Sequence, residues 1–154
     1  MTVDIDAFYS AEPIDAWREI LGDGLHYHGG YFHGHEDLVT GQRQAVQRLW
    51  QHIPSGASVL DAGCGWGGPA TMLVHEHGCR VEGVTVSTAQ AAYCRSIGIE
   101  ASRLDLETDE LRGRYDVAFA LESLSHMADK REVLRTRRGV TRRRARSRRA
   151  GRRR

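Results

Sequence analysis

Apolar positions along residues 58–134 fall into short runs separated by amphipathic stretches. Runs such as SVLDA and DVAFAL have the length and composition of strands buried in a parallel sheet. Strands are expected at Ser58–Ala62, Val81–Val86, near Ala101–Leu104, and at Asp116–Leu121. Helices are expected at Asp15–Leu21, Leu38–Ile53, Pro69–His77, Ala89–Ile97, and from Lys130 to at least Leu134. This alternation predicts an α/β fold with a parallel sheet and right-handed crossovers.

Residues 22–35, GDGLHYHGGYFHGH, are rich in Gly, His and aromatic side chains and show no hydrophobic period. We call this segment the aromatic loop and expect it to fold over a ligand. Its histidines are His26, His28, His33 and His35. No carboxylate or cysteine lies at ligand spacing from them, so no metal site is predicted. His75 and His77 are expected on the surface of a helix.

Charge divides the chain into an acidic part and a basic tail. Residues 1–134 contain all 20 acidic residues and ten basic ones, a net charge of −10. Residues 135–154 contain 12 Arg and no acid, so the tail is expected to be disordered and outside the fold. The preferred interpretation is a reading-frame change in GC-rich coding sequence, which would make the chain a fragment whose sheet stops at the fourth strand. The alternative is a native tail that binds nucleic acid through its phosphates.

The cysteines and the apolar content exclude several other classes. Cys64, Cys79 and Cys94 form no CxxC motif, which indicates neither a disulfide framework nor a zinc site. No run resembles a signal peptide or approaches the ~20 apolar residues of a membrane-spanning helix. The expected location is therefore the cytoplasm.

A glycine-rich loop, GCGWGG, follows the first predicted strand and precedes a helix. Glycine allows the backbone to turn tightly and to approach a ligand closely. Its spacing fits both GxGxG and the GxGxxG of a dinucleotide site. Two features speak against a dinucleotide: Asp61 precedes the first glycine, and Glu82 falls early in the second strand rather than at its end.

Four segments carry a resemblance to a known family. The run D-x-G-C-G-W-G resembles motif I of class I S-adenosylmethionine (SAM) dependent methyltransferases. HYHGGYF (26–32) and GVTVSTAQ (83–90) resemble segments of cyclopropane fatty acid and mycolic acid synthases and related C-methyltransferases. LESLSHM (121–127) departs from the synthase pattern and resembles small-molecule and natural-product methyltransferases. The resemblance implies a Rossmann-like methyltransferase core, of which the chain holds the first four strands.

The resemblance also implies a cofactor site for SAM. The loop glycines would face its methionine part, Thr85 and Gln90 would lie near the ribose, and Asp105 and Leu106 would bracket the adenine. Tyr27 and His28 would close over it. The expected cofactor-binding residues are Tyr27, His28, Asp61, Gly63, Gly65, Gly67, Thr85, Gln90, Asp105 and Leu106. The alternatives are that Thr85 and Ser87 only end a strand and that Asp105 only caps a turn.

The segment after the fourth strand supplies the candidate catalytic residues, His126 and Glu122. A neutral imidazole at His126 could take a proton from the acceptor as the methyl group arrives. A hydrogen-bonded structural histidine is the alternative. Alignment alone can supply ~7–11 kcal/mol of the barrier, so methyl transfer needs little acid–base help.

Three parts are expected: residues 1–36, an N-terminal helix with the aromatic loop as a lid; residues 37–134, a partial SAM-binding core; and the tail, residues 135–154. The expected function is methyl transfer from SAM to a small organic acceptor such as a lipid, isoprenoid or polyketide-like molecule. An inactive SAM-binding remnant and a nucleic-acid-binding protein are the alternatives. The sequence does not fix the oligomeric state.

Overall fold

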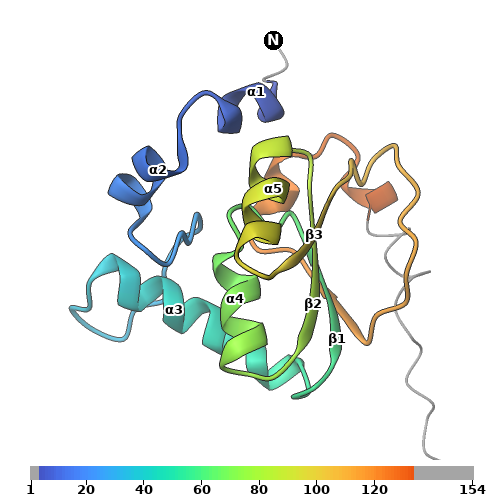
Figure 1. Ribbon diagram of the computed structural model, residues 1–154. Helices are drawn as coiled ribbons and strands as arrows, with labels where there is room; N and C mark the ends of the chain where they lie inside the picture. The colour runs from blue at the N-terminus through green and yellow to red at the C-terminus, as the bar shows by residue number, and fades with distance from the viewer. Residues whose placement is uncertain (1–3, 134–154) are drawn as a thin grey trace, which may run out of the picture.

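The computed structural model describes residues 4–133 (Figure 1). Its helices are α1 (Ile5–Ser10), α2 (Ile14–Leu21), α3 (Leu38–Leu49), α4 (Gly68–His75) and α5 (Thr88–Ser96), with the 3-10 helices η1 (Trp50–His52) and η2 (Ser123–His126). Its strands are β1 (Ser58–Ala62), β2 (Arg80–Thr85), β3 (Glu100–Arg103) and β4 (Val117–Phe119). The tail predicted at residues 135–154 lies outside the described residues.

The four strands form one parallel sheet in the order β3-β2-β1-β4. The predicted α/β fold with a parallel, Rossmann-like sheet is therefore confirmed. Because β1 is central, both of its faces are buried: Val59 and Leu60, on opposite faces, are fully inaccessible to solvent.

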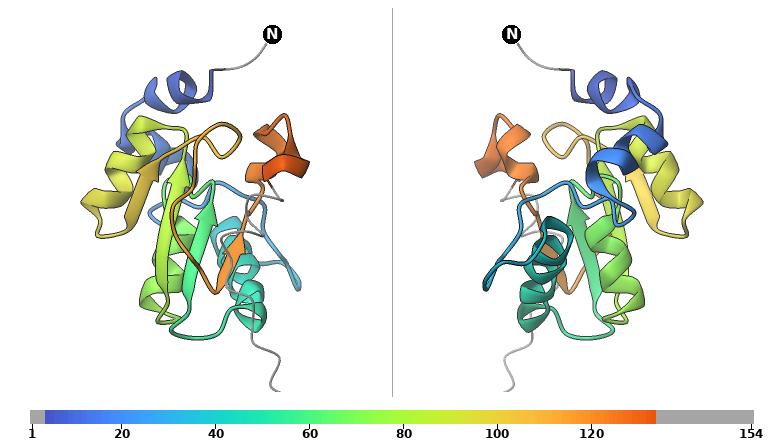
Figure 2. Two further views of the ribbon diagram at one scale, coloured as in Figure 1. Left: turned by 90° about the vertical axis from the view of Figure 1, so that its right-hand side faces the viewer. Right: turned by 90° about the vertical axis from the view of Figure 1, so that its left-hand side faces the viewer.

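Two apolar layers, one on each face, enclose the sheet, and Figure 2 shows the ribbon of the segments around it. One lies between the sheet and helices α4 and α5, where Val59 and Val81 meet Leu73 and Cys94. The second lies on the opposite face, where the chain from residue 104 to residue 133 packs on Leu60 and Val84. This segment replaces a regular helix layer on that face of the described structure.

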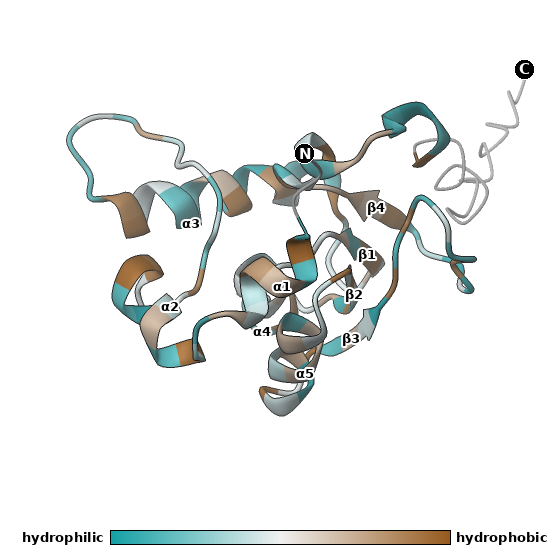
Figure 3. Cartoon of the chain, turned by 90° about the horizontal axis from the view of Figure 1, so that it is seen from above, coloured by the Kyte–Doolittle hydropathy of each residue, from teal (hydrophilic) through white to brown (hydrophobic). Residues whose placement is uncertain are grey.

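The N-terminal helices form a third apolar cluster above the carboxyl edge of the sheet. Tyr9, Trp17, Leu21 and Leu25 pack around Trp66 of the glycine-rich loop. Helix α1 lies beside α5, as Figure 3 shows from above. The cluster fixes α1 and α2 next to the site where the glycine-rich loop leaves the sheet.

Two predictions about helices near the sheet were wrong in detail. The helix expected to run to Ile53 ends at Leu49 and continues as η1. Helix α4 ends at His75, so His77 is not on its surface. The His77 ring stacks on Trp50 at 4.9 Å, and its Nε2 lies 2.7 Å from the Ile53 carbonyl oxygen. None of the helices within residues 4–133 combines the length and hydropathy needed to cross a lipid bilayer.

Candidate functional site

A cavity of about 1060 Å³ opens at the carboxyl edge of the sheet. Its wall comes from α1, the aromatic loop and the segments that follow each of the four strands. Ligands of open α/β sheets bind at this edge. Every site residue predicted from the sequence lines the cavity except Gly67: Tyr27, His28, Asp61, Gly63, Gly65, Thr85, Gln90, Asp105, Leu106, Glu122 and His126.

The glycine-rich loop reverses direction through three left-handed residues, Gly63, Gly65 and Gly67, with φ of +89°, +54° and +84°. Its start is tied to β2, because the amides of Gly63 and Cys64 both donate to the Val84 carbonyl, at 2.8 and 3.0 Å. A Cβ on Gly67 would lie 2.9 Å from Cys94 Sγ, so this glycine packs against α5.

Gly65 differs from Gly67 in what it faces. A Cβ on Gly65 would meet no atom within 4 Å, and the residue lines the cavity. The loop therefore turns bare backbone toward the space that a ligand would occupy. Beside it, Asp61 is almost fully buried at the end of β1.

Thr85 and Gln90 form a neutral polar pair at the end of β2. The Thr85 hydroxyl donates to Gln90 Oε1 at 2.7 Å and accepts from the Ser87 amide at 3.1 Å. Both side chains are buried, with exposed fractions of 7% and 2%. The pair is thus held in place by its own hydrogen bonds. Glu82 does not line the cavity and instead accepts a hydrogen bond from Tyr115 Oη at 2.6 Å.

Asp105 and Leu106 follow β3 and line the same cavity. Asp105 Oδ1 accepts from the Glu107 amide at 2.9 Å, so this side chain does cap a turn as the alternative interpretation expected. Leu106 is buried in the apolar layer beneath it. Asp105 therefore both caps a turn and lines the cavity.

Hydrogen bonds to α3 and a histidine pair hold the aromatic loop. Gln42 Nε2 donates to the carbonyl oxygens of His26 and His28, at 2.7 and 2.9 Å. The two imidazoles are hydrogen-bonded, with His26 Nδ1 and His28 Nε2 at 3.1 Å, and both are buried. Burial, with the nearby His28 and Arg43, lowers the pKa of His26 to about 4, so its imidazole is neutral at pH 7.

Tyr27 lies between these histidines in the sequence but, unlike them, is not buried. Its ring is 48% exposed and packs edge-on against Tyr9 and Trp17, with centroids 5.9 and 5.8 Å away. The loop thus has a half-exposed phenol at the cavity, while hydrogen bonds from Gln42 hold its backbone to α3.

The segment after β4 contacts the aromatic loop. Glu122 has a left-handed backbone, with φ of 59°, and its Oε1 accepts from the Gly29 amide at 2.9 Å. Ser123 Oγ donates to the carbonyl oxygen of Ala62, which ties this segment to β1. His126 ends η2 and is exposed at the cavity wall.

Helix α1 contributes wall residues that the sequence did not predict. Asp6 lines the cavity and accepts hydrogen bonds from the Thr88 amide and hydroxyl, at 2.8 and 3.0 Å. The bond from the Thr88 amide is the main cause that lowers the pKa of Asp6. The sequence feature that could have indicated this short helix is Asp4, an N-cap residue whose side chain accepts a hydrogen bond from the Ala7 amide.

Metal-binding residues do not gather anywhere in the described range. Among residues 4–133, no group of three or more His, Cys, Asp and Glu side chains is placed to hold a metal ion.

Residues 6–131 match the sequence profile of the mycolic acid cyclopropane synthetase family. A relative described as a probable chloroplastic tocopherol O-methyltransferase, from Oryza sativa subsp. japonica, is 29% identical over 80% of this chain and 39% of its own length. Sarcosine/dimethylglycine N-methyltransferase from Halorhodospira halochloris is 27% identical over 83% of this chain and 50% of its own. The chain thus spans half or less of the length of these relatives.

Solved structures of methyltransferases and cyclopropane synthases also resemble this chain. Coclaurine N-methyltransferase, bound to N-methylheliamine and S-adenosylhomocysteine (SAH), superposes with a TM-score of 0.78 and 25% identity over 85% of this chain and 42% of that one. A mycolic acid cyclopropane synthase in complex with SAH gives 0.74 and 20% over 86% of this chain and 51% of that one, a likeness of fold.

Proposed function

The chain belongs to the mycolic acid cyclopropane synthetase family, and from this membership we propose that it binds SAM in the cavity at the carboxyl edge of its sheet. We further propose that it carries the cofactor-binding part of a methyltransferase for a small organic acceptor. The observation that carries the proposal is the open space at Gly65, where bare backbone lines a cavity large enough for a cofactor and a second small molecule.

The polar groups around the cavity fit SAM better than a dinucleotide. Thr85 and Gln90 offer neutral hydrogen-bonding groups where a ribose would lie. Glu82, the acid that a dinucleotide would require, is bonded to Tyr115 away from the cavity. Asp105 could accept from the exocyclic amine of adenine with its second carboxylate oxygen, above the apolar Leu106.

The aromatic loop would act as a lid over the cofactor. Tyr27 and His28 line the cavity, and Gln42 holds the backbone on both sides of Tyr27 through the carbonyl oxygens of His26 and His28. Closing a cavity against water strengthens the electrostatic interactions inside it and aligns the reactants. The half-exposed Tyr27 side chain is the part of the loop that a bound ligand would contact and cover.

Bound SAM would supply an electrophilic methyl group on a sulfonium centre. The chain's own contribution would be to hold the acceptor in line with that group and to manage the acceptor proton. His126, which lines the cavity at the exposed end of η2, would accept this proton at an imidazole nitrogen. Glu122 would position the lid, since its carboxylate holds the Gly29 amide.

The acceptor is proposed to be a small lipid, isoprenoid or polyketide-like molecule. The cavity wall on the α2 and α3 side carries Ile20 and Leu38, which are 70% and 55% exposed. Leu121 and Met127 line it on the β4 side. Apolar side chains on both sides favour an acceptor with an apolar body. A relative acts on 2-methyl-6-phytyl-1,4-hydroquinone according to its name, which agrees with this class.

Isothermal titration of the full chain with SAM and with NAD tests the cofactor. SAM binding without NAD binding is expected, and NAD binding without a response to SAM would reject the proposal. Gly65→Val should abolish SAM binding because the branched side chain would occupy the cavity. Gly98→Val is the matched control: Gly98 is also left-handed, with φ of +81°, and also has open space around its Cβ, but it lies outside the cavity. It should keep SAM binding despite the same backbone strain.

A further inference from the structure

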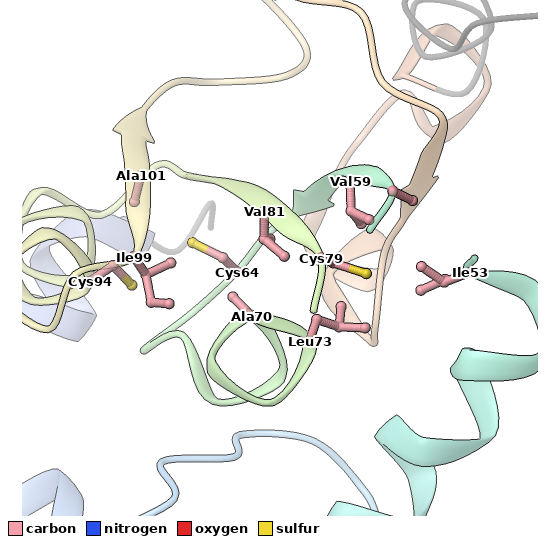
Figure 4. Packing of buried hydrophobic residues seen from close by; sticks show 11 residues of the cluster. Ile53, Val59, Cys64, Ala70, Leu73, Cys79, Val81, Cys94, Ile99 and Ala101 are labelled. Carbon is pink, nitrogen blue, oxygen red and sulfur yellow. The ribbon is translucent and has the colours of Figure 1, made fainter. Parts of the chain in front are cut away.

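Two of the three cysteines, Cys64 and Cys94, come together beneath the glycine-rich loop. Cys64 belongs to this loop and Cys94 to α5. Their sulfur atoms contact the same atom, the Gly65 carbonyl oxygen, at 3.7 and 3.6 Å. In Figure 4, Cys94 lies at the α5 end of the apolar layer and the Cys64 sulfur points toward that end, while Cys79 lies on the other side of Val81.

Glycines make the room for both sulfur atoms. A Cβ on Gly83 would lie 2.7 Å from Cys64 Sγ, and a Cβ on Gly67 would lie 2.9 Å from Cys94 Sγ. The exposed fractions of the two cysteines are 4% and 0%, and Cys64 also lines the cavity. The thiols are therefore confined together, with the cavity as the route to them.

The two side chains influence each other's ionisation. The nearby Cys94 side chain, followed by burial and the Asp61 carboxylate, raises the pKa of Cys64. The Cys64 side chain in turn lowers the pKa of Cys94. Loss of one proton thus leaves a thiolate next to a thiol, the arrangement from which disulfides form.

We propose that Cys64 and Cys94 are a modification site: a dithiol pair that a peroxide oxidises to a disulfide, which deforms the glycine-rich loop and weakens cofactor binding there. The effect on the cofactor rests on the function proposed above. The thiolate of the pair attacks one peroxide oxygen, the O–O bond breaks, and hydroxide leaves a sulfenic acid. The second thiol then attacks the sulfur of the sulfenic acid, so that the S–S bond forms as the S–O bond breaks. The hydroxyl group leaves and takes up the proton of the second thiol as water. Two thiols lose two electrons, and the peroxide becomes two waters once the hydroxide takes up the first thiol's proton.

Deformation of the loop follows from the position of Gly65. A disulfide brings its sulfur atoms to about 2 Å. Because the Gly65 carbonyl oxygen lies against both sulfurs, closing the bond displaces the residue whose backbone faces the cavity. A ligand in the cavity would also cover the approach to Cys64, so SAM should slow the oxidation.

Treatment of the full chain with hydrogen peroxide, followed by peptide mapping and titration with SAM, tests the proposal. We expect a Cys64–Cys94 disulfide, SAM affinity at least tenfold weaker, and recovery on adding a dithiol reductant. Cys94→Ser should lose both effects. Cys79→Ser is the matched control, a buried thiol in the same apolar layer, and should keep both.

Three outcomes would overturn the proposal: no Cys64–Cys94 linkage, a linkage that involves Cys79 instead, or a correct linkage that changes SAM affinity less than twofold. Failure of the proposed function is recognised separately, because then the reduced chain does not bind SAM at all. In that case the mapped linkage and hydrogen exchange of residues 63–67 before and after oxidation decide the proposal.

Discussion

Glu122 and Gly29 are 93 residues apart in the sequence, yet the Glu122 carboxylate accepts a 2.9 Å hydrogen bond from the Gly29 amide. Glu122 does so from a left-handed backbone, a conformation that costs a residue other than glycine ~1–2 kcal/mol. The contact joins the segment after β4 to the aromatic loop, next to the cavity-lining residues Tyr27 and His28. Strain of this kind persists where the surrounding structure holds it, often at functional sites.

We expect Glu122→Ala to weaken SAM binding about fivefold, since an exposed hydrogen bond contributes ~1 kcal/mol. Hydrogen exchange of residues 24–34 should rise in the same variant because the loop loses one anchor. Glu122→Gln keeps an acceptor oxygen and should restore most of the affinity. Glu76→Ala, which removes an exposed glutamate bonded to Arg43 outside the cavity, is the control. Equal affinity for Glu122→Ala and wild type would show that the contact does not position the lid.

Turnover measured with a methyl acceptor distinguishes a catalytic role of His126 from a role in cofactor binding. His126→Ala should lower kcat by about 10²–10⁴-fold, the usual contribution of a general base, with SAM affinity within twofold of wild type. His126 is exposed at the end of η2, so the substitution should leave the fold unchanged. His75→Ala, an exposed histidine at the end of α4, is the matched control. Full turnover of His126→Ala across the pH range would leave alignment as the sole source of catalysis.

Stability should depend on pH through His26. Burial lowers its pKa in the folded protein from 6.5 to about 4, so the unfolded chain takes up a proton first as the pH falls. The stabilisation present above pH 6.5 is therefore lost between pH 6.5 and 4, by about 3 kcal/mol at most. Below pH 4 this contribution stays constant.

Urea unfolding at several pH values measures the His26 effect. The difference in unfolding free energy between wild type and His26→Gln should shrink steadily from pH 6.5 to 4, because the variant lacks the titrating group. His75→Gln should follow the wild-type curve. A pH-independent difference between wild type and His26→Gln would assign His26 a packing role without titration.

The sheet was predictable because its signals are local. Strand β1 has the predicted bounds, Ser58–Ala62, since a short apolar run before a glycine-rich turn is unambiguous. Helix α1 was missed because six residues are too short to show a helical period. The predicted surface position of His77 was wrong because α4 ends two residues earlier and Trp50, distant in sequence, offers a stacking surface.

The candidate site was predictable to the extent that it follows strand ends. Thr85, Asp105 and His126 line one cavity because parallel strands end at one edge of a sheet. The left-handed backbone of Glu122 and the meeting of Cys64 with Cys94 depend on tertiary packing, which no local pattern encodes. Gly67 lies in the predicted motif but packs against α5, because the motif specifies the turn of the loop and not the face of each glycine.

The docking of α1 onto α5 gives a last prediction. Asp6 accepts from both the amide and the hydroxyl of Thr88, next to the N-terminus of α5, where a negative charge is favourable. Asp6→Ala should release α1 from the cavity wall and weaken SAM binding about threefold, a modest effect because the side chain is near solvent. Thr88→Val keeps the amide donor and should lose less.

Asp15→Ala, which removes an exposed acid of α2 paired with Arg18, is the control for the loss of charge. Because the pKa of Asp6 is lowered from 3.8, its contact is complete at neutral pH and is lost only as the pH falls through the folded pKa. Stopped-flow release of SAM at pH 7 should therefore be faster for Asp6→Ala than for Asp15→Ala. Equal release rates would mean that α1 lines the cavity without closing it, and that the aromatic loop alone retains the cofactor.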